Sequence, residues 1–596
     1  MKKILVLAAA AAALLSCSTA PQWKPVEGRI MTRWASEVDP EAPLGEYPRP
    51  AMVREGGWAS LNGLWNYAIV PSEAEKPEKW DGRILVPFAP ESALSGVGRN
   101  VLPEEALWYE TTFKWAPGET TLLHFGAVDW KAEVWVNGKY AGAHTGGYMG
   151  FTLDVTPYLK PSLKQTLLVR VEDGTDNDRQ PRGKQVLHPE GIWYTAVSGI
   201  WQSVWIENVP KAHIARYTYT SDISDGSVSV TVETEGGDEV EVSAGGVTAT
   251  AKPGEKAVLT FPEPSLWTPD HPCLYDLSIS LKQDGKAVDT VTGYVALREI
   301  GTIRDASGNL RMTLNGEPLF HFGPLDQGWW PDGLYTAPTD EALRFDIEKT
   351  KEMGFNMIRK HVKVEPERWY YWCDKLGILV WQDMPSITDN RFVKWDYIHF
   401  GGTEWDAPEE VRDTYYHEWG EIVDGLKNHP SIVVWVPFNE AWAQFETAKV
   451  VDFTRGLDST RLVNQASGGN YIKGVGDIYD YHHYPNPEFE FFEKSQVSVQ
   501  GEYGGIGFPV AGYLWKDDGN WGYIQHSSSD EVLARYREYA EMLKALIPQG
   551  CSAAVYTQTT DVEGEVNGLM TYDRKVVKMD AADLCEINRG VIEAMR

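Results

Sequence analysis

From Asn309 to the C-terminus, short apolar runs alternate with segments of helical period. The predicted strands are PLFHFGPLD, FNMIRKHV, GILVWQDMP, SIVVWVPFNE, RLVNQAS, DIYDYHHYP, QVSVQGEYG and CSAAVYTQT. Helix-like runs such as TDEALRFDIEKTKEMG and SSDEVLARYREYAEMLKAL lie between most of them. This alternation is typical of βα units that build a parallel sheet. Eight such strands predict a C-terminal (β/α)8 TIM barrel over residues 306–596.

The preceding residues form a different pattern, in which short strands rich in Val, Trp and Phe are separated by Gly, Asn and Pro turns. In KAEVWVNGKYAG, the pair Asn137 and Gly138 accepts the positive φ angles of a tight hairpin turn. These features predict a jelly-roll β-sandwich over residues 51–210. The regular alternation in SVSVTVETEGGDEVEVSAGGVTATA then predicts a small immunoglobulin-like β-sandwich over residues 211–305.

The first residues, MKKILVLAAAAAALLSC, combine two lysines, an apolar run and small residues before Cys17. This order is typical of an export signal, and the run is too short to span a bilayer. LLSC resembles the lipobox of bacterial lipoproteins, which implies a signal peptide of residues 1–16 and lipidation of Cys17. A cut near Ser18 or Ala20 without lipidation is the alternative. We expect a lipid-anchored protein of the bacterial cell envelope, on its periplasmic or outer-membrane face, with a polar N-terminal connector over residues 17–50.

Charge and cysteine content narrow the class of protein. Lys and Arg total 55 against 85 Asp and Glu, a net charge of −30, which repels phosphate backbones and anionic membrane surfaces. We therefore expect no nucleic-acid partner, and membrane contact only through the lipid anchor. The cysteines after Cys17 are too few and too scattered for a disulfide framework or a CxxC metal site. The oligomeric state stays open, a homo-oligomer included.

Asn439 and Glu440 end the fourth predicted strand of the barrel, and Glu502 ends the seventh. The active sites of TIM barrels lie at these carboxyl ends, although Glu440 alone could instead cap the following helix. Two Glu residues on opposing strands can act on one sugar, one protonating the leaving oxygen while the other attacks the anomeric carbon. Glycoside hydrolysis is the reaction that such a pair suits best.

Other strand ends carry polar groups that we expect to contact the same substrate. They are Arg359, His361, Asp383, His482, Tyr484, Tyr503 and Gln558. We expect Arg359 to keep Glu502 ionised, because a buried cation favours the charged carboxylate. A catalytic metal is not expected, since HExxH and comparable spacings are absent from the sequence. Trp329 and Trp330 follow the first strand and either form a wall against the terminal sugar or pack against the sandwich domain.

These residues resemble glycoside hydrolase family 2, the family of β-galactosidases, β-glucuronidases and β-mannosidases. The segments GAVDWKAEVWVNGKYAGAHTGGYMGF and GIWYTAVSGIWQSVWIE are similar to its sugar-binding domain, and GFNMIRKHVKVEPERWYYWCDKLGILVWQDMP to its second and third barrel strands. The resemblance implies that Glu440 is the acid/base, that Asn439 bonds the sugar 2-hydroxyl, and that Glu502, followed by Tyr503, is the nucleophile. Gly501 replaces the Ser that usually precedes the nucleophile. The implied enzyme is a retaining glycosidase that needs no cofactor, and a wall formed by Trp329 and Trp330 predicts that it removes single terminal sugars.

The terminal sugar is the least determined part of this interpretation. Glucuronidases of the family carry an Asn-x-Lys motif, whereas Asn567 is followed here by Gly568 and Leu569. An oligo- or polysaccharide ending in a β-galactoside is therefore the favoured substrate. A β-mannoside, an arabinoside or a β-glucuronide stays open. A surface glycan-binding protein without catalysis is the alternative from another class.

Overall fold

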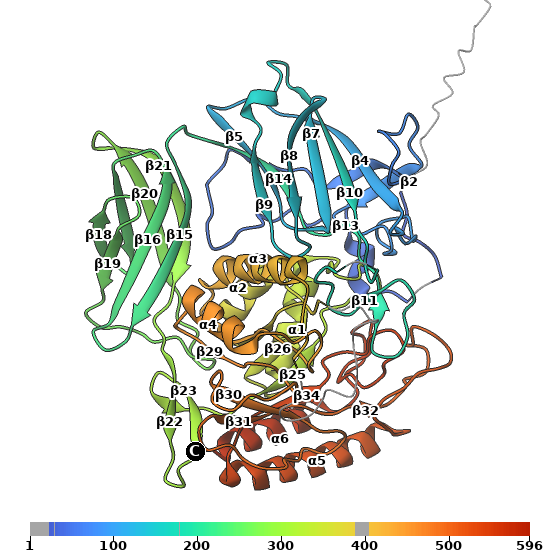
Figure 1. Cartoon of the computed structure of the whole chain (residues 1–596), viewed down its shortest axis with the longest axis vertical. Coiled ribbons are helices and arrows are strands. Elements are labelled where there is room, and N and C mark those ends of the chain that lie inside the picture. The colour runs from blue at the N-terminus through green and yellow to red at the C-terminus, as the bar shows by residue number, and fades with distance from the viewer. Residues whose placement is uncertain (1–22, 29, 178, 388–403, 596) are drawn as a thin grey trace, which may run out of the picture.

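Two β-sandwiches and a TIM barrel follow one another along the chain, which confirms the predicted fold class. The computed structural model describes residues 23–28, 30–177, 179–387 and 404–595. Figure 1 shows the jelly-roll sandwich above the barrel and the immunoglobulin-like sandwich at its side. Cys17 and the expected signal peptide lie outside the described residues. Within the described residues, no helix combines the length and apolar character that a bilayer crossing requires.

The jelly-roll sandwich consists of two antiparallel sheets. The first orders β1 (Trp58–Ser60), β14 (Val204–Val209), β5 (Thr120–Phe125) and β9 (Phe151–Asp154). The second orders β3 (Gly82–Val86), β2 (Gly63–Pro71), β4 (Glu105–Lys114), β10 (Lys164–Glu172), β7 (Lys131–Val136) and β8 (Lys139–Thr145). Alternate residues such as Val134 and Val169 fill the space between the sheets, because successive strand residues point to opposite faces. Two short pairs, β11 (Gln185–Val186) with β12 (Tyr194–Thr195) and β6 (Val128–Asp129) with β13 (Gly199–Ile200), complete the domain.

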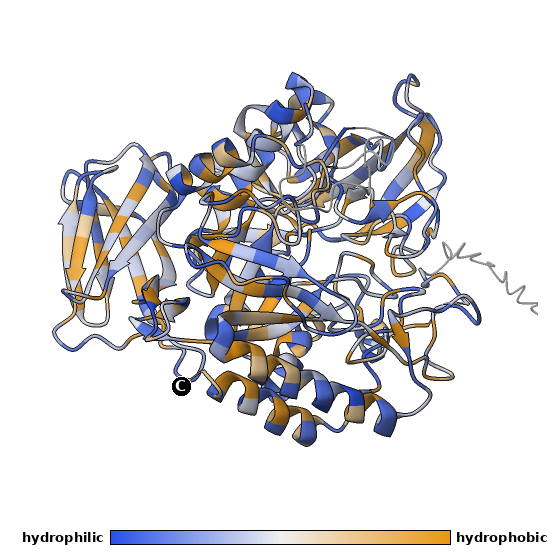
Figure 2. Cartoon of the chain, turned by 60° about the horizontal axis from the view of Figure 1, so that its bottom comes forward, coloured by the Kyte–Doolittle hydropathy of each residue, from blue (hydrophilic) through white to orange (hydrophobic). Residues whose placement is uncertain are grey.

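The immunoglobulin-like sandwich is smaller and more regular. Its sheets order β15 (His213–Asp222), β16 (Ser227–Glu235) and β19 (Lys256–Thr260), and β18 (Val247–Ala251), β17 (Glu239–Ala244), β20 (Tyr275–Gln283) and β21 (Lys286–Val295). Hydrophobic and hydrophilic positions alternate along these strands in Figure 2. Val228, Val230 and Val232 are fully buried on one face of β16, so that aliphatic side chains build most of this core.

A three-stranded sheet that the sequence pattern did not predict joins this sandwich to the barrel. It consists of β22 (Ile300–Arg304), β23 (Leu310–Leu314) and β24 (Glu317–Pro318). Met312 and Leu314 of β23 pack in one cluster with barrel residues such as Met357 and Val433. The sheet thereby seals the interior of the barrel at the end opposite the carboxyl ends of its strands.

All eight predicted strands form the barrel. They are ordered β29 (Leu462–Val463), β28 (Ile432–Val436), β27 (Leu379–Asp383), β26 (Met357–Lys360), β25 (His321–Asp326), β34 (Cys551–Thr557), β31 (Val497–Gly504) and β30 (Ile478–His482). A parallel bridge between Asn464 and Ile478 closes the sheet between β29 and β30. The surrounding helices are α1 (Asp340–Glu352), α2 (Glu367–Leu376), α3 (Glu409–Leu426), α4 (Thr447–Leu457), α5 (Ser529–Leu546) and α6 (Ala581–Glu593). Both expected helices are present as α1 and α5, and each starts at a side-chain cap, Thr339 and Ser528.

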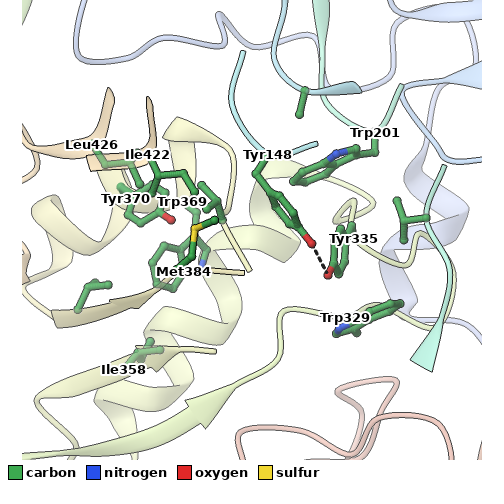
Figure 3. Close-up of a cluster of buried hydrophobic side chains, with 14 of the residues drawn as sticks. Tyr148, Trp201, Trp329, Tyr335, Ile358, Trp369, Tyr370, Met384, Ile422 and Leu426 are labelled. Atoms are coloured by element: carbon green, nitrogen blue, oxygen red, sulfur yellow. Dashed lines mark hydrogen bonds between the residues drawn. The ribbon is translucent and has the colours of Figure 1, made fainter. Parts of the chain in front are cut away.

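Aromatic side chains join the jelly-roll sandwich to the barrel. Figure 3 shows Tyr148 and Trp201 of the sandwich against Trp329 and Tyr335 of the barrel. Trp329 is 1% exposed and Trp330 is 2% exposed, so neither forms a wall against a sugar. The alternative, packing against the sandwich, is the one observed, because burial of these rings between two domains removes a large apolar area from water.

Part of the expected N-terminal connector also packs on this boundary. The short 3-10 helix η1 (Arg33–Glu37) carries Trp34, whose ring meets that of Trp330 edge-on with centroids 6.1 Å apart. The Thr32 hydroxyl donates a hydrogen bond of 2.6 Å to Asp332. This stretch is therefore folded onto the barrel.

Candidate active site

Two carboxylates converge at the carboxyl ends of the barrel strands. Glu502 lies in β31, and Glu440 lies in the loop that follows β28. One oxygen of each and one ring nitrogen of His482 lie within 4.8 Å of one another. The Glu502 side chain is 7% exposed and that of Glu440 is 19% exposed. The more buried carboxylate is thus the expected nucleophile, and the one more open to water is the expected acid/base.

The backbone that presents Glu440 is strained. Glu440 has φ of 49° and the next residue, Ala441, has φ of 61°, a left-handed region that costs non-glycine residues about 1–3 kcal/mol each. The Glu440 N–H donates to the Ser467 carbonyl at 2.8 Å, and Asn439 forms a parallel bridge to the same serine. These contacts hold the loop and aim the carboxylate across the barrel mouth.

Arg359, on β26, is the positioning residue at the centre of the site. Its Nη1 donates to Glu502 Oε1 at 3.0 Å and to the Gly501 carbonyl at 3.2 Å. Its Nη2 donates to Asn439 Oδ1 at 2.6 Å and, with Nε, to the two oxygens of Asp383. Burial alone would raise the pKa of Glu502, but the charges of His482, Arg359 and Lys184 outweigh it and hold that pKa below its ordinary value. The expected support of Glu502 by Arg359 is therefore present, and the nucleophile is kept ionised.

The predicted substrate contacts of Arg359 and Asp383 need correction. Every N–H of the Arg359 guanidinium already has an acceptor in the protein, and both side chains are fully buried. Asp383 also lies 3.1 Å from His361 Nδ1. Burial, followed by the charges of Lys184 and Arg359, holds the pKa of His361 well below its ordinary value. Asp383 thus orients the Arg359 cation and the neutral His361 imidazole.

Asn439 is prepared to bind a substrate hydroxyl. Its Oδ1 is fixed by Arg359. Its Nδ2 is buried and has no hydrogen-bond partner among the described residues. A buried unpaired donor is costly, and a ligand that accepts a hydrogen bond removes that cost. The geometry therefore fits the role that the resemblance implies for Asn439.

His482 and Tyr484 connect the two carboxylates. His482 Nδ1 lies 3.1 Å from Glu440 Oε1, and its Nε2 lies 2.8 Å from the Ser467 hydroxyl. The Tyr484 hydroxyl donates to Glu502 Oε2 at 2.7 Å. Burial opposes a charge on His482, but Glu502 and Glu440 raise the pKa of the imidazole above its ordinary value. Both predicted residues thus lie in the site and contact its carboxylates.

Tyr503 does not face the substrate, contrary to expectation. It is 1% exposed and packs with Tyr536, Tyr539 and Tyr556 in the cluster beneath α5. The reason is the period of the strand: neighbouring residues point to opposite faces, so that Glu502 facing the mouth directs Tyr503 to the helices. Gln558 is also fully buried, and its Nε2 donates to Asn567 Oδ1 at 2.8 Å.

Sequence reasoning missed the residues that other segments bring to the same mouth. Tyr523 stacks on Tyr484 with ring centroids 3.7 Å apart. Tyr194, from the jelly-roll sandwich, donates a hydrogen bond to Glu565. Lys184, from the same sandwich, carries one of the charges that lower the pKa of Glu502. Each contact joins residues far apart in the chain, so no local pattern signals it.

Glu440, His482 and Glu502 are also close enough together to ligate a cation. Glu502, however, already accepts hydrogen bonds from Arg359 and Tyr484, and His482 is bound to Ser467. These contacts suit proton transfer and nucleophilic attack, and we interpret the cluster in that way.

Comparisons with known proteins show the family of the chain. Three family models match consecutive segments: Glycosyl hydrolase 2 galactose-binding domain-like over residues 90–205, Glycosyl hydrolases family 2 over residues 203–298, and Glycosyl hydrolases family 2, TIM barrel domain over residues 336–506. Among solved structures, the β-glucuronidase of Lactobacillus rhamnosus has a TM-score of 0.73 at 20% identity, covering 91% of this chain and 98% of that one. That likeness shows the shared fold.

Two curated relatives are similar over most of the chain. A putative β-glucuronidase of Formosa agariphila is 29% identical over 485 residues, which cover 78% of this chain and 52% of the relative. A β-galactosidase of Bacteroides ovatus is 28% identical over 493 residues, which cover 68% of this chain and 53% of the relative. The chain spans about half the length of these curated relatives. With three consecutive family models matched and the family's domain order observed, the chain belongs to glycoside hydrolase family 2.

Proposed function

We propose that the chain is a retaining exo-β-glycosidase that removes single sugars from the non-reducing ends of saccharides. The observation that carries the proposal is the separation of Glu440 and Glu502, whose nearest oxygens lie within 4.8 Å. Carboxylates of retaining enzymes lie about 5–5.5 Å apart, whereas inverting enzymes need about 6.5–9.5 Å to admit a water between them. The pair therefore supports attack by a carboxylate.

The reaction proceeds in two displacements. Glu502, held ionised by Arg359, attacks the anomeric carbon while Glu440 donates its proton to the departing oxygen. The bond to the leaving group breaks as the glycosyl–Glu502 ester forms. Glu440, now a carboxylate, takes a proton from water, and the resulting hydroxide releases the sugar and restores Glu502.

Aromatic side chains around the nucleophile support the exo specificity. Tyr523 and Tyr484 stack on one side of Glu502. On another side Trp193 of the jelly-roll sandwich lies 5.1 Å, centroid to centroid, from Trp442 of the barrel. Aromatic walls of this kind suit the apolar faces of one terminal ring. These residues, and not the buried Trp329 and Trp330, support the exo specificity.

The terminal sugar has two candidates, a neutral sugar and an uronic acid. The absence of a lysine at Leu569 favours a neutral sugar such as galactose, and a relative named as a β-galactosidase agrees with it. A relative named as a putative β-glucuronidase is similar over a larger share of this chain. An uronic acid is therefore the second candidate.

Substitution of the two carboxylates tests the proposal. Glu502→Gln should lower kcat by about 10⁴-fold or more for every aryl β-glycoside, because the nucleophile is lost. Glu440→Gln should lower kcat by about 10²- to 10⁴-fold for alkyl leaving groups and far less for dinitrophenyl groups, which need no proton.

Glu541→Gln, at a carboxylate exposed on α5, is the matched control and should behave as the unaltered protein. Equal losses in Glu440→Gln for both leaving groups would exclude the acid role. Sugar binding without hydrolysis of any glycoside would favour the glycan-binding alternative.

A further inference from the structure

A loop of the jelly-roll sandwich docks on the carboxyl ends of the barrel strands. The N–H groups of Arg182 and Gly183 donate to the Ser386 carbonyl at 3.0 and 3.2 Å, and Pro181 forms an antiparallel bridge with Ile387. Gly183 has φ of 59°, and a Cβ at this position would lie 2.4 Å from the Val362 carbonyl oxygen. Only glycine allows so close an approach. The loop is thereby fixed above β26 and β27.

Buried polar groups support this loop from within the sandwich. Gln185 donates to Asp129 at 2.9 Å and accepts from the Val197 N–H at 2.7 Å. Gln185 is 1% exposed and Asp129 is also 1% exposed. A loop held by hydrogen bonds to buried groups on both sides has little freedom to move. Lys184, between the two anchors, is consequently presented in a defined place.

Lys184 is buried and forms no close ion pair, although its charge opposes the rise that burial causes in the pKa of Glu565. The residue is 6% exposed. Its Nζ lies 5.8 Å from the Tyr194 ring centroid and 5.9 Å from that of Trp442, and Trp442 follows Glu440 by two positions. No hydrogen bond or ion pair joins this ammonium to any residue in the described ranges. An anionic ligand that reached this ammonium would supply the partner that the protein does not.

The surroundings of Lys184 show that the unpaired group at this wall is the cation. Its neighbour Tyr194 donates to one oxygen of Glu565, and Asn567 donates to the other at 3.0 Å. The Lys184 charge also lowers the pKa of Glu502, after burial and the charges of His482 and Arg359 have acted on it. The ammonium is therefore close enough to the nucleophile to act on its charge. An anionic group on the bound sugar would pair with this ammonium.

We propose that Lys184 binds the carboxylate of a terminal hexuronic acid and so makes the enzyme a β-uronidase. The proposal rests on the proposed retaining mechanism and specifies its substrate. Sequence reasoning disfavoured an acid sugar because position 569 holds Leu in place of Lys. The structure supplies a lysine from another domain, 385 positions earlier in the chain. A charge-assisted hydrogen bond of this kind is stronger than a neutral one and contributes most where water is excluded.

Matched substrates test the proposal on the unaltered enzyme. We expect kcat/KM for an aryl β-hexuronide to exceed that for the corresponding neutral aryl β-hexoside by about 10- to 100-fold, the range of one charge-assisted hydrogen bond. Methyl esterification of the uronide removes the charge and should remove the preference. Hydrolysis of the neutral hexoside in preference to the uronide, or equal rates for acid and ester, would overturn the role of Lys184.

Substitution of Lys184 tests whether this residue causes the preference for the uronide. Lys184→Met should lower the ratio of uronide to hexoside kcat/KM by about 10- to 100-fold, mainly through KM. Lys184→Arg should restore a large part of it. Lys139→Met, at an exposed lysine of the same sandwich, is the control and should leave the ratio unchanged.

The same measurements separate a substrate-binding role of Lys184 from a purely electrostatic role and from failure of the mechanism. If Lys184→Met lowered both substrates equally and moved the acidic limb of the pH profile upward, Lys184 would only serve to ionise Glu502, and the proposal would be wrong. If the unaltered protein hydrolysed neither substrate and formed no adduct with 2-deoxy-2-fluoroglycosyl fluorides, the retaining mechanism itself would fail. Hydrolysis of hexosides alone, with an adduct on Glu502, would reject the uronide and keep the mechanism.

Discussion

The two β-sandwiches contact opposite ends of the barrel, and their interiors differ accordingly. The jelly-roll sandwich meets the carboxyl ends of β26 and β27 through Gly183. The immunoglobulin-like sandwich meets α2, where Tyr294 donates to Asp374 at 2.7 Å, and the residues just before β28, where Asn428 donates to the Tyr217 carbonyl at 2.8 Å. These contacts lie at the other end of β28 from Glu440. One sandwich can therefore shape the active site, and the other can only support it.

The buried acidic side chains of the two sandwiches differ in the same way. The jelly-roll sandwich buries three carboxylates beneath its docking loop, Glu91, Asp129 and Asp173, and burial raises the pKa of each. In the immunoglobulin-like sandwich the buried acid Asp289 is instead paired with Arg54 at 3.0 Å. Burial of an acid costs free energy, so the gathering of three acids under one loop indicates that the position of that loop matters. Two domains of one architectural class thus carry different functions.

Among the tests of this division between the sandwiches, displacement of the docking loop should have the largest effect. Gly183→Val should lower kcat/KM by about 100-fold, because a displacement near 1 Å is enough to misplace a bound substrate. Gly254→Val is the matched control: Gly254 has φ of 79° in the immunoglobulin-like sandwich, but a Cβ there meets no atom within 4 Å. Both variants should lose about 1–2 kcal/mol of stability from the left-handed backbone. Equal activity in the two variants would contradict the division between the sandwiches.

A smaller effect is expected from pH. Burial raises the pKa of Glu91 from 4.5 to about 8, so that the folded sandwich favours the protonated acid. Its contribution to the free energy of unfolding is complete below about 4.5 and is lost as the pH rises through about 8. The Tm should fall over this window, and Glu91→Gln, which mimics the neutral acid, should flatten the fall. An unchanged slope in the variant would show that Glu91 is not buried in its protonated form.

The fold was largely predictable from the sequence, and the reason lies in particular segments. SIVVWVPFNE and QVSVQGEYG are apolar runs that end at carboxylates. These runs predict that Glu440 and Glu502 lie at the carboxyl ends of barrel strands. The contact of Arg359 with Glu502 was predictable because both residues end barrel strands and a buried Arg keeps a neighbouring carboxylate ionised. The sheet that contains β23 was not predicted, because its strands are short and close a barrel whose open end only the folded structure reveals.

The errors in the site have physical causes too. Tyr503 was expected to contact the substrate, although strand alternation places it on the face opposite Glu502. Trp329 and Trp330 fit either a pocket wall or a domain boundary, and only packing decides between these. Lys184 was missed because its neighbours in space, Tyr194 and Trp442, lie on different domains.

The smallest expected effect concerns the supporting sandwich. Tyr294→Phe removes the hydrogen bond to Asp374 and should lower the free energy of unfolding by about 1–2 kcal/mol. Because the contact lies far from Glu440, kcat/KM should stay within about twofold of the unaltered enzyme. Denaturant unfolding and steady-state kinetics measure the two quantities. A large loss of activity at full stability would show that this sandwich also acts on the active site.

The stereochemistry of the first-formed product tests the double displacement most directly. Proton NMR during rapid hydrolysis of an aryl β-glycoside follows the anomeric proton of the released sugar before it mutarotates. Attack by Glu502 followed by water on the opposite face predicts the β anomer first, with the α anomer appearing only later. Initial release of the α anomer would show that water attacks directly, and would contradict the covalent mechanism that the separation of Glu440 and Glu502 supports.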